Sequence, residues 1–130
     1  MSRLQANLSV KEGGQLLEAA FAMGINFVDT AESYDNYHHI RWALERGWSH
    51  KVHIATKSYA YTAEQMQDSL EKALRELKRD YIDVFLLHEQ ESSLTLKGHD
   101  EALEYLQRAK EQGLVRATGI STHTVAGARA

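Results

Sequence analysis

The sequence predicts an α/β fold built from parallel βαβ units, organised as one domain over residues 1–130. Four short apolar runs, which open near residues 25, 52, 81 and 115, are typical of strands spaced by roughly 30 residues. A helical pattern fills each gap, and such helical crossovers make successive strands parallel. A doubly wound sheet and a (β/α) barrel both fit this pattern, so periodicity alone does not choose between them.

The first predicted unit is a helix that begins after Ser9 and ends at Gly24. Ser9 and Glu12 have the spacing of a capping box, and apolar residues then recur at helical intervals. A glycine pair at positions 13–14 is expected to weaken the first turn. The β-branched and aromatic run 25–29 predicts the strand that follows.

A second helix and strand follow in the same order. Residues 37–46 predict a helix that ends at Gly47, and residues 52–56 predict the strand after it. His38 and His39 lie at the start of this helix. Because adjacent helical residues do not share a face, we expect both side chains to be solvated and assign no metal site to them.

The third and fourth units complete the pattern. Thr62 and Gln65 form another capping-box match, and the helix they open leads to the most regular strand, at 81–87. A further amphipathic helix stops at Gly113, and 115–120 predicts the fourth strand. The remaining residues are expected to begin another helix.

The composition excludes several classes of protein. Hydrophobic residues make up 43% of the chain and charged residues 25%, and the formal net charge is -3 with both signs mixed along the sequence. A polybasic nucleic-acid surface is therefore not expected. The absence of cysteine excludes disulfides and thiolate chemistry. No apolar run reaches the length of a membrane span or a leader, so we expect a soluble cytoplasmic protein without a membrane partner.

Polar residues end three of the predicted strands. Asp29, Lys57 and His88 each terminate an apolar run, and Tyr34 lies in the first of the loops that follow. Taken singly, these residues suit ordinary roles such as a helix cap, a solvated strand end or a structural histidine. Because the carboxyl ends of parallel strands converge on one face, the four side chains together predict a proton-transfer site there.

Four segments carry these residues in a fixed order: GINFVDTAESY, IATK, DYIDVFLLH and VRATGIS. In order and spacing, from about residue 9 to residue 122, the chain resembles the aldo-keto reductase superfamily. The resemblance implies a partial (β/α)8 TIM barrel, of which this chain would supply the second to fifth strands. It also implies reduction of an aldehyde or ketone, a small carbonyl substrate, by NADPH or less often NADH.

The resemblance also implies a role for each polar residue. Tyr34 matches the general acid that protonates the carbonyl oxygen, and Lys57 matches the cation beside that phenol. Asp29 matches the carboxylate that pairs with the lysine, and His88 matches the histidine that orients the carbonyl. A nearby cation is expected to help the phenol exchange its proton, since a free tyrosine titrates near 10.

Two positions are implied to touch the nicotinamide amide. Ser121 matches the family's serine after the fifth barrel strand, whereas Thr122 stands where asparagine is usual. Asp35 also departs from the family, which often has glycine after its catalytic tyrosine. Four residues that follow strand ends fit two interpretations, as the pocket mouth or as surface loops: Tyr59, Tyr61, Glu89 and Gln90.

Against the family pattern, the chain lacks the segments that hold the cofactor's pyrophosphate and adenine, so this stretch alone is expected to be inactive or deficient in cofactor binding. Open sheet edges favour a homo-oligomer, in which two copies close one barrel or cover each other's edges. The alternatives are a structural fragment without activity and a non-catalytic binding module that resembles channel subunits of the same fold.

Overall fold

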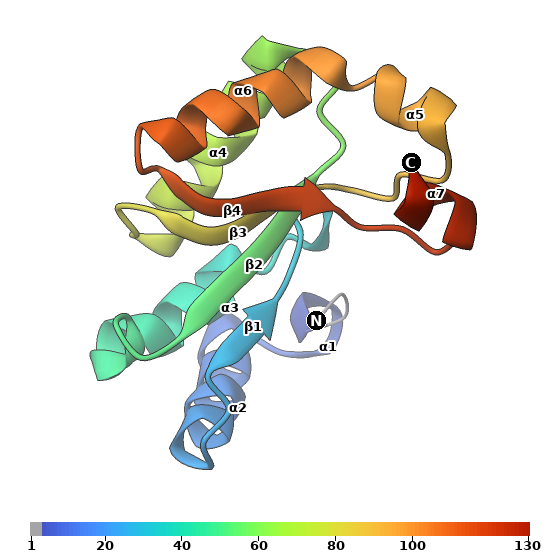
Figure 1. Ribbon diagram of the computed structural model, residues 1–130. Helices are drawn as coiled ribbons and strands as arrows, with labels where there is room; N and C mark the ends of the chain where they lie inside the picture. The colour runs from blue at the N-terminus through green and yellow to red at the C-terminus, as the bar shows by residue number, and fades with distance from the viewer. Residues whose placement is uncertain (1–3) are drawn as a thin grey trace.

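The computed structural model describes residues 4–130, and its four strands form one parallel sheet in the order β1-β2-β3-β4. The polar N-terminal residues 1–3 lie outside the described part. The strands are β1 (Phe27–Asp29), β2 (His53–Ser58), β3 (Ile82–Leu87) and β4 (Val115–Ile120). A doubly wound sheet would reverse direction at a switch point, whereas this order follows the chain. The predicted α/β class and partial barrel are confirmed, and the described sheet is not closed (Figure 1).

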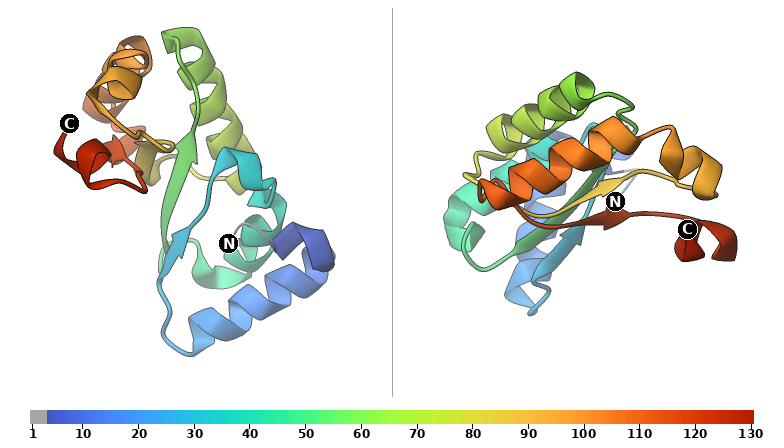
Figure 2. Two further views of the ribbon diagram at one scale, coloured as in Figure 1. Left: turned by 90° about the vertical axis from the view of Figure 1, so that its right-hand side faces the viewer. Right: turned by 45° about the horizontal axis from the view of Figure 1, so that its top comes forward.

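Helices fill the connections between the strands. They are α1 (Leu4–Asn7), α2 (Val10–Ala22), α3 (Tyr37–Ala43), α4 (Ala63–Leu77), α5 (Ser93–Lys97), α6 (Asp100–Glu111) and α7 (Val125–Arg129). A 3-10 turn, η1 (Glu32–Tyr34), follows β1, and a π turn, η2 (Leu44–Trp48), extends α3. The long helices pack in chain order, α2 on α3, α3 on α4 and α4 on α6, as Figures 1 and 2 show. No helix in residues 4–130 is long and apolar enough to cross a membrane.

Both predicted capping boxes are present. Ser9 Oγ accepts the Glu12 N–H at 3.3 Å, and Glu12 Oε2 accepts the Ser9 N–H at 2.9 Å. Thr62 and Gln65 make the equivalent exchange at the start of α4. These local bonds satisfy backbone donors that have no partner inside a helix, so the sequence signal located both helix starts.

The glycine pair has a tertiary role that the sequence did not reveal. A Cβ atom at Gly14 would lie 2.4 Å from Cε3 of Trp42, and one at Gly13 would lie 2.7 Å from Cδ2 of His39. The pair lets α2 approach α3 closely, and α2 runs through it unbroken. The expectation that His39 is solvated was wrong: its ring is buried and its Nε2 lies 3.2 Å from the carbonyl oxygen of Leu8.

The first strand begins two residues later than expected. Gly24 has a φ of 98°, and the following Ile25 N–H bonds back to the carbonyl of Ala20 at 3.2 Å. The backbone of Ile25 therefore completes the end of α2 and does not join the sheet. The register with β2 begins at Phe27, and the carbonyl of the preceding Asn26 accepts the His53 N–H at 2.8 Å.

The sheet has one covered and one open face. Alternate side chains, including Val28, Ile54 and Phe85, are buried in a single apolar cluster beneath the helices. Coverage of the other face is uneven: Ala55 and Lys57 of β2 are buried there, whereas Phe27 of β1 is 51% exposed. This two-residue alternation fixes which strand-end side chains share the open face.

Candidate active site

The four predicted residues meet at the carboxyl ends of β1, β2 and β3. Asp29 is the last residue of β1, and Lys57 is the penultimate residue of β2. Tyr34 closes the turn η1, and His88 directly follows β3. Residues from four separate segments therefore converge at one edge of the sheet, because parallel strands bring their carboxyl ends together.

Lys57 is the buried charge of the cluster. Its side chain is 6% exposed, and its Nζ donates to Asp29 Oδ1 and to the carbonyl oxygen of Thr30, each at 2.7 Å. A buried ammonium requires such partners, since an unpaired charge is costly away from water. The Asp29 side chain is 59% exposed, so water shares in solvating this ion pair.

Tyr34 lies between the ammonium and the imidazole. Lys57 Nζ is 5.5 Å from the centre of the Tyr34 ring. The rings of Tyr34 and His88 meet edge to face, with centroids 5.8 Å apart and planes at 76°. Burial raises the pKa of Tyr34, and the charges of Asp29 and Glu89 raise it further. The phenol therefore holds its proton at neutral pH, and Lys57, paired with Asp29, does not lower its pKa below the ordinary value.

His88 is a buried, neutral imidazole. Its side chain is 4% exposed, and its Nδ1 has no hydrogen-bond partner among residues 4–130. Burial lowers the pKa of His88 and Lys57 lowers it further, while Glu89 and Asp29 act in the opposite sense. An unpartnered buried nitrogen costs free energy, and His39 Nδ1 and Gln90 Oε1 are unpartnered in the same way among residues 4–130.

Tyr59, which the sequence places either at the pocket mouth or on a surface loop, contacts His88. Its ring stacks on His88 with centroids 4.3 Å apart and planes at 24°. Its hydroxyl donates to Glu89 Oε2 at 2.6 Å, and burial together with this bond raises the pKa of Tyr59 to about 12. Tyr61 instead stacks on His99, away from the cluster. Both follow β2, so only the tertiary contacts separate a site residue from a surface one.

The predicted cofactor contacts lie one strand further along. Ser121 Oγ accepts the Glu89 N–H at 2.9 Å, and the Ser121 N–H donates to the carbonyl oxygen of Leu87 at 2.8 Å. Thr122 Oγ1 accepts the Thr124 N–H at 3.1 Å and donates to the Thr124 carbonyl at 3.3 Å. Ser121 thus joins the end of β4 to the loop that carries His88, whereas the hydroxyl of Thr122 is occupied within its own turn.

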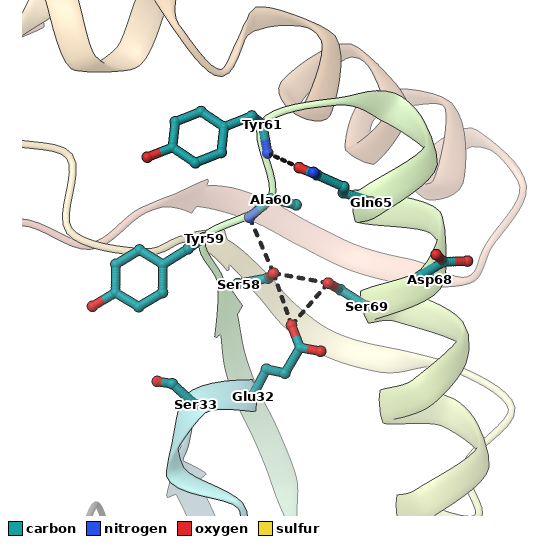
Figure 3. A pocket seen from close by; sticks show the side chains of 9 residues that line it. All are labelled: Glu32, Ser33, Ser58, Tyr59, Ala60, Tyr61, Gln65, Asp68 and Ser69. Carbon is teal, nitrogen blue, oxygen red and sulfur yellow. Dashed lines mark hydrogen bonds between the residues drawn. The ribbon is translucent and has the colours of Figure 1, made fainter.

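A pocket of about 500 Å³ lies beside the cluster, as Figure 3 shows. The Glu32 carboxylate lines it, and its Oε2 accepts hydrogen bonds from Ser58 Oγ at 2.9 Å and Ser69 Oγ at 2.8 Å. Lys72 Nζ is 3.6 Å from the other Glu32 oxygen. Tyr59 lines this pocket, but Tyr34, Lys57 and His88 do not. The proton-carrying groups therefore lie beside this cavity and outside its lining.

Comparison with known proteins identifies the family to which the chain is similar. The model of the aldo/keto reductase family matches residues 4–129. The methylglyoxal reductase DkgB of Escherichia coli O157:H7 is 29% identical over 113 residues, which cover 84% of this chain and 42% of the relative. An aldo-keto reductase of Mycolicibacterium paratuberculosis is 30% identical over 123 residues, with coverages of 92% and 42%.

Solved structures show the same relationship in three dimensions. The crystal structure of an aldo/keto reductase from Klebsiella pneumoniae in complex with NADP and acetate has a TM-score of 0.76 at 26% identity. The alignment covers 92% of this chain and 42% of that one. The chain thus spans less than half the length of these relatives, yet the family model covers nearly all of it. The chain belongs to the aldo/keto reductase family.

Proposed function

We propose that this chain holds the acid–base residues of an NADP(H)-dependent reductase that converts an aldehyde or ketone to an alcohol. One observation carries the proposal: Tyr34, Lys57 and His88 meet at the carboxyl ends of neighbouring strands, with Asp29 bound to Lys57. The family membership supports it, and the solved relative from Klebsiella pneumoniae contains NADP.

Tyr34 is the proposed general acid. Like any tyrosine it is protonated at neutral pH, so a proton is available for a carbonyl oxygen, although burial and the charges of Asp29 and Glu89 raise its pKa and make it a weaker acid in the chain alone. Lys57 lies 5.5 Å from the ring and is held there by Asp29, so a cation is present beside the phenolate that remains after transfer. Asp29 acts here as a positioning residue.

His88 is proposed to orient the carbonyl group. As a neutral imidazole it has one N–H donor, and the stacked ring of Tyr59 restricts its rotation. A hydrogen bond from this ring to the carbonyl oxygen holds that oxygen near the Tyr34 hydroxyl and polarises the bond to be reduced.

The cofactor, NADPH or NADH, supplies the hydride when it is bound. Ser121 fits a nicotinamide amide, because its Oγ accepts the Glu89 N–H and its own proton remains a donor. Thr122 fits less well, since its hydroxyl already bonds within the turn to Thr124. We assign no residue of this chain to the cofactor's phosphates or adenine, and we expect weak cofactor binding by this chain alone.

The test is a Tyr34→Phe substitution. This chain alone is expected to be inactive or deficient in cofactor binding, so the test applies to any turnover of a generic aldehyde that saturating NADPH restores. We expect the substitution to lower that turnover, followed by NADPH absorbance, by roughly 10²–10⁴-fold, the usual contribution of a general acid. Tyr105→Phe, on the outer helix α6, is the matched control and should change nothing. Equal turnover in the Tyr34 variant and the wild type would reject the general-acid role. If the wild type neither turns over nor shows quenching of tryptophan fluorescence by NADPH, the chain acts as a structural or binding module.

We further propose a cytoplasmic protein that self-associates. The support is the half-exposed Phe27 and the outer edges of β1 and β4, which pair with no other described strand. Exposed apolar surface and free strand edges favour association. Light scattering should therefore give a mass of at least two chains, and a monodisperse monomer at micromolar concentration would contradict the proposal.

A further inference from the structure

Glu89 is held in a fixed position in front of the imidazole of His88. Its backbone is left-handed, with a φ of 55°, and its N–H donates to Ser121 Oγ. Its Oε2 accepts the hydroxyl of Tyr59 at 2.6 Å, while its Oε1 lies 3.9 Å from His88 Nε2 and 3.5 Å from His123 Nε2. Glu89 is thus held by hydrogen bonds of both its backbone and its side chain, unlike a surface carboxylate that contacts only water.

The charge on Glu89 has no strong counter-charge. The hydrogen bond from Tyr59 lowers the pKa of Glu89, and His123 lowers it further, so the group is an anion at neutral pH. The ammonium of Lys57 is already paired with Asp29. His88 is kept neutral by burial, and His123 is 76% exposed, where water screens it. The surroundings of the His88 imidazole therefore carry a negative charge at Glu89.

We propose that Glu89 selects substrates by charge. Carbonyl compounds whose remainder is neutral or cationic approach His88 and Tyr34, whereas those that carry a carboxylate or a phosphate are repelled. The inference rests on the proposed function, since it takes His88 and Tyr34 to bind the carbonyl oxygen. Tyr59 acts through Glu89 as a positioning residue, because its hydroxyl holds the carboxylate and its ring holds the imidazole.

Glu89→Gln tests the inference, because it removes the charge and keeps an oxygen that can accept the Tyr59 hydroxyl. The probes are benzaldehyde and 4-carboxybenzaldehyde, which differ by one negative charge. The measured quantity is the ratio of kcat/KM for the neutral aldehyde to that for the anionic one. We expect the wild type to favour the neutral aldehyde and the substitution to reduce this ratio by roughly tenfold, the effect of one unit charge several ångströms away in a partly solvated site.

Two controls sharpen the result. Glu104→Gln makes the same chemical change on an exposed position of α6 and should leave the ratio unaltered. Raising the salt concentration to about 1 M should shrink the preference of the wild type, because a solvent-exposed charge is then screened within roughly 3 Å. A ratio that is equal in wild type and Glu89→Gln overturns the inference.

A binding measurement separates this inference from the proposed reaction. Dissociation constants of the two aldehydes, obtained by saturation-transfer NMR, need no turnover. Charge-dependent binding that is lost in Glu89→Gln, without any reduction, would support the charge selection and reject the proposed reaction. Binding of neither aldehyde at millimolar concentration, or equal binding of both by the wild type, would overturn the charge selection.

Discussion

The two ends of the sheet each contain a buried cation paired with an aspartate. The two ion pairs differ in the solvent exposure of the aspartate and in the other hydrogen bonds that they make. At the amino end, Arg79 and Asp83 are 5% and 8% exposed in their side chains. Arg79 also donates to the carbonyls of Ser49 and Val52, at 2.5 and 3.2 Å. Asp83 accepts the Ile54 N–H at 2.9 Å, besides its contact with the ring of His53.

At the carboxyl end of the sheet, some polar atoms have no hydrogen-bond partner among the described residues. Asp29 is mostly exposed beside Lys57, and His88 Nδ1 and Gln90 Oε1 have no partner in the described chain. Two non-glycine residues there, Asp35 and Glu89, adopt left-handed backbone conformations. In parallel α/β folds the amino end serves stability and the carboxyl end serves ligands. In this molecule the buried ion pair at the amino end makes further hydrogen bonds, whereas His88 Nδ1 and Gln90 Oε1 at the carboxyl end have no partner in the described chain.

The largest expected effect comes from removing the cation at each end. Arg79→Met should lower the free energy of unfolding by about 3–5 kcal/mol, because it leaves the buried Asp83 without its guanidinium. Lys57→Met should cost less than half of that, since water already reaches the Asp29 carboxylate that would be left behind. Urea denaturation of both variants measures the difference. Equal losses would remove the contrast between the two ends.

A substitution in α7 tests how closely this helix packs against the loop of Gln90 at the carboxyl end of the sheet. A Cβ atom at Gly127 would lie 2.1 Å from the backbone oxygen of Gln90 and 2.3 Å from Thr122 Oγ1. Helix propensity alone would make Gly127→Ala stabilising by about 1 kcal/mol. We expect the opposite sign, a loss of about 1–3 kcal/mol through overpacking.

Gly98→Ala is the matched control for that substitution. Its added Cβ would meet the Thr95 carbonyl oxygen at 3.3 Å, so only a small shift of the neighbour is needed. Thermal unfolding of both variants provides the comparison. A gain in stability for Gly127→Ala would show that α7 is not seated against the loop of Gln90.

The smallest expected effect concerns the pH dependence of stability. Because burial depresses the pKa of His88 below 6.5 in the folded chain, the unfolded chain binds the proton more readily. His88 therefore has no effect on stability well above pH 6.5 and destabilises the fold as the pH falls below it. The slope is at most about 1.4 kcal/mol per pH unit.

Chemical denaturation of wild type and His88→Gln between about pH 5 and 8 measures this term, since the other histidines are common to both proteins. The wild type should lose stability more steeply on the acid side. Parallel curves would mean that the imidazole is as well solvated as in the unfolded chain, and that the carboxyl end is not a desolvated site.

Local signals located most elements but not their contacts. The capping boxes at Ser9 and Thr62 could be recognised in the sequence, because the two partners of each box lie within four residues of each other. The short first strand and the burial of His39 were missed, because they depend on the close approach of α2 to α3 and on the backbone of Ile25. The single-domain organisation over residues 1–130 remains a prediction.

The candidate site divides in the same way. Asp29, Tyr34, Lys57 and His88 could be assigned from the sequence, since strand ends are marked by apolar runs and parallel strands converge at one edge. For Glu89 and Tyr59, the sequence fits both a position at the pocket mouth and a position on a surface loop. Their hydrogen bond joins residues thirty positions apart, and no local pattern encodes it.

By itself, then, the sequence determined the order of strands and helices, the side of the sheet that carries the polar residues, and the family resemblance. These features depend on the spacing of residue types along the chain, which can be seen in the sequence itself. Tertiary structure alone decided which rings stack, which carboxylate is tied down and which nitrogen lacks a partner. Those features depend on packing between segments distant in the chain, where shifts of an ångström change whether a hydrogen bond forms.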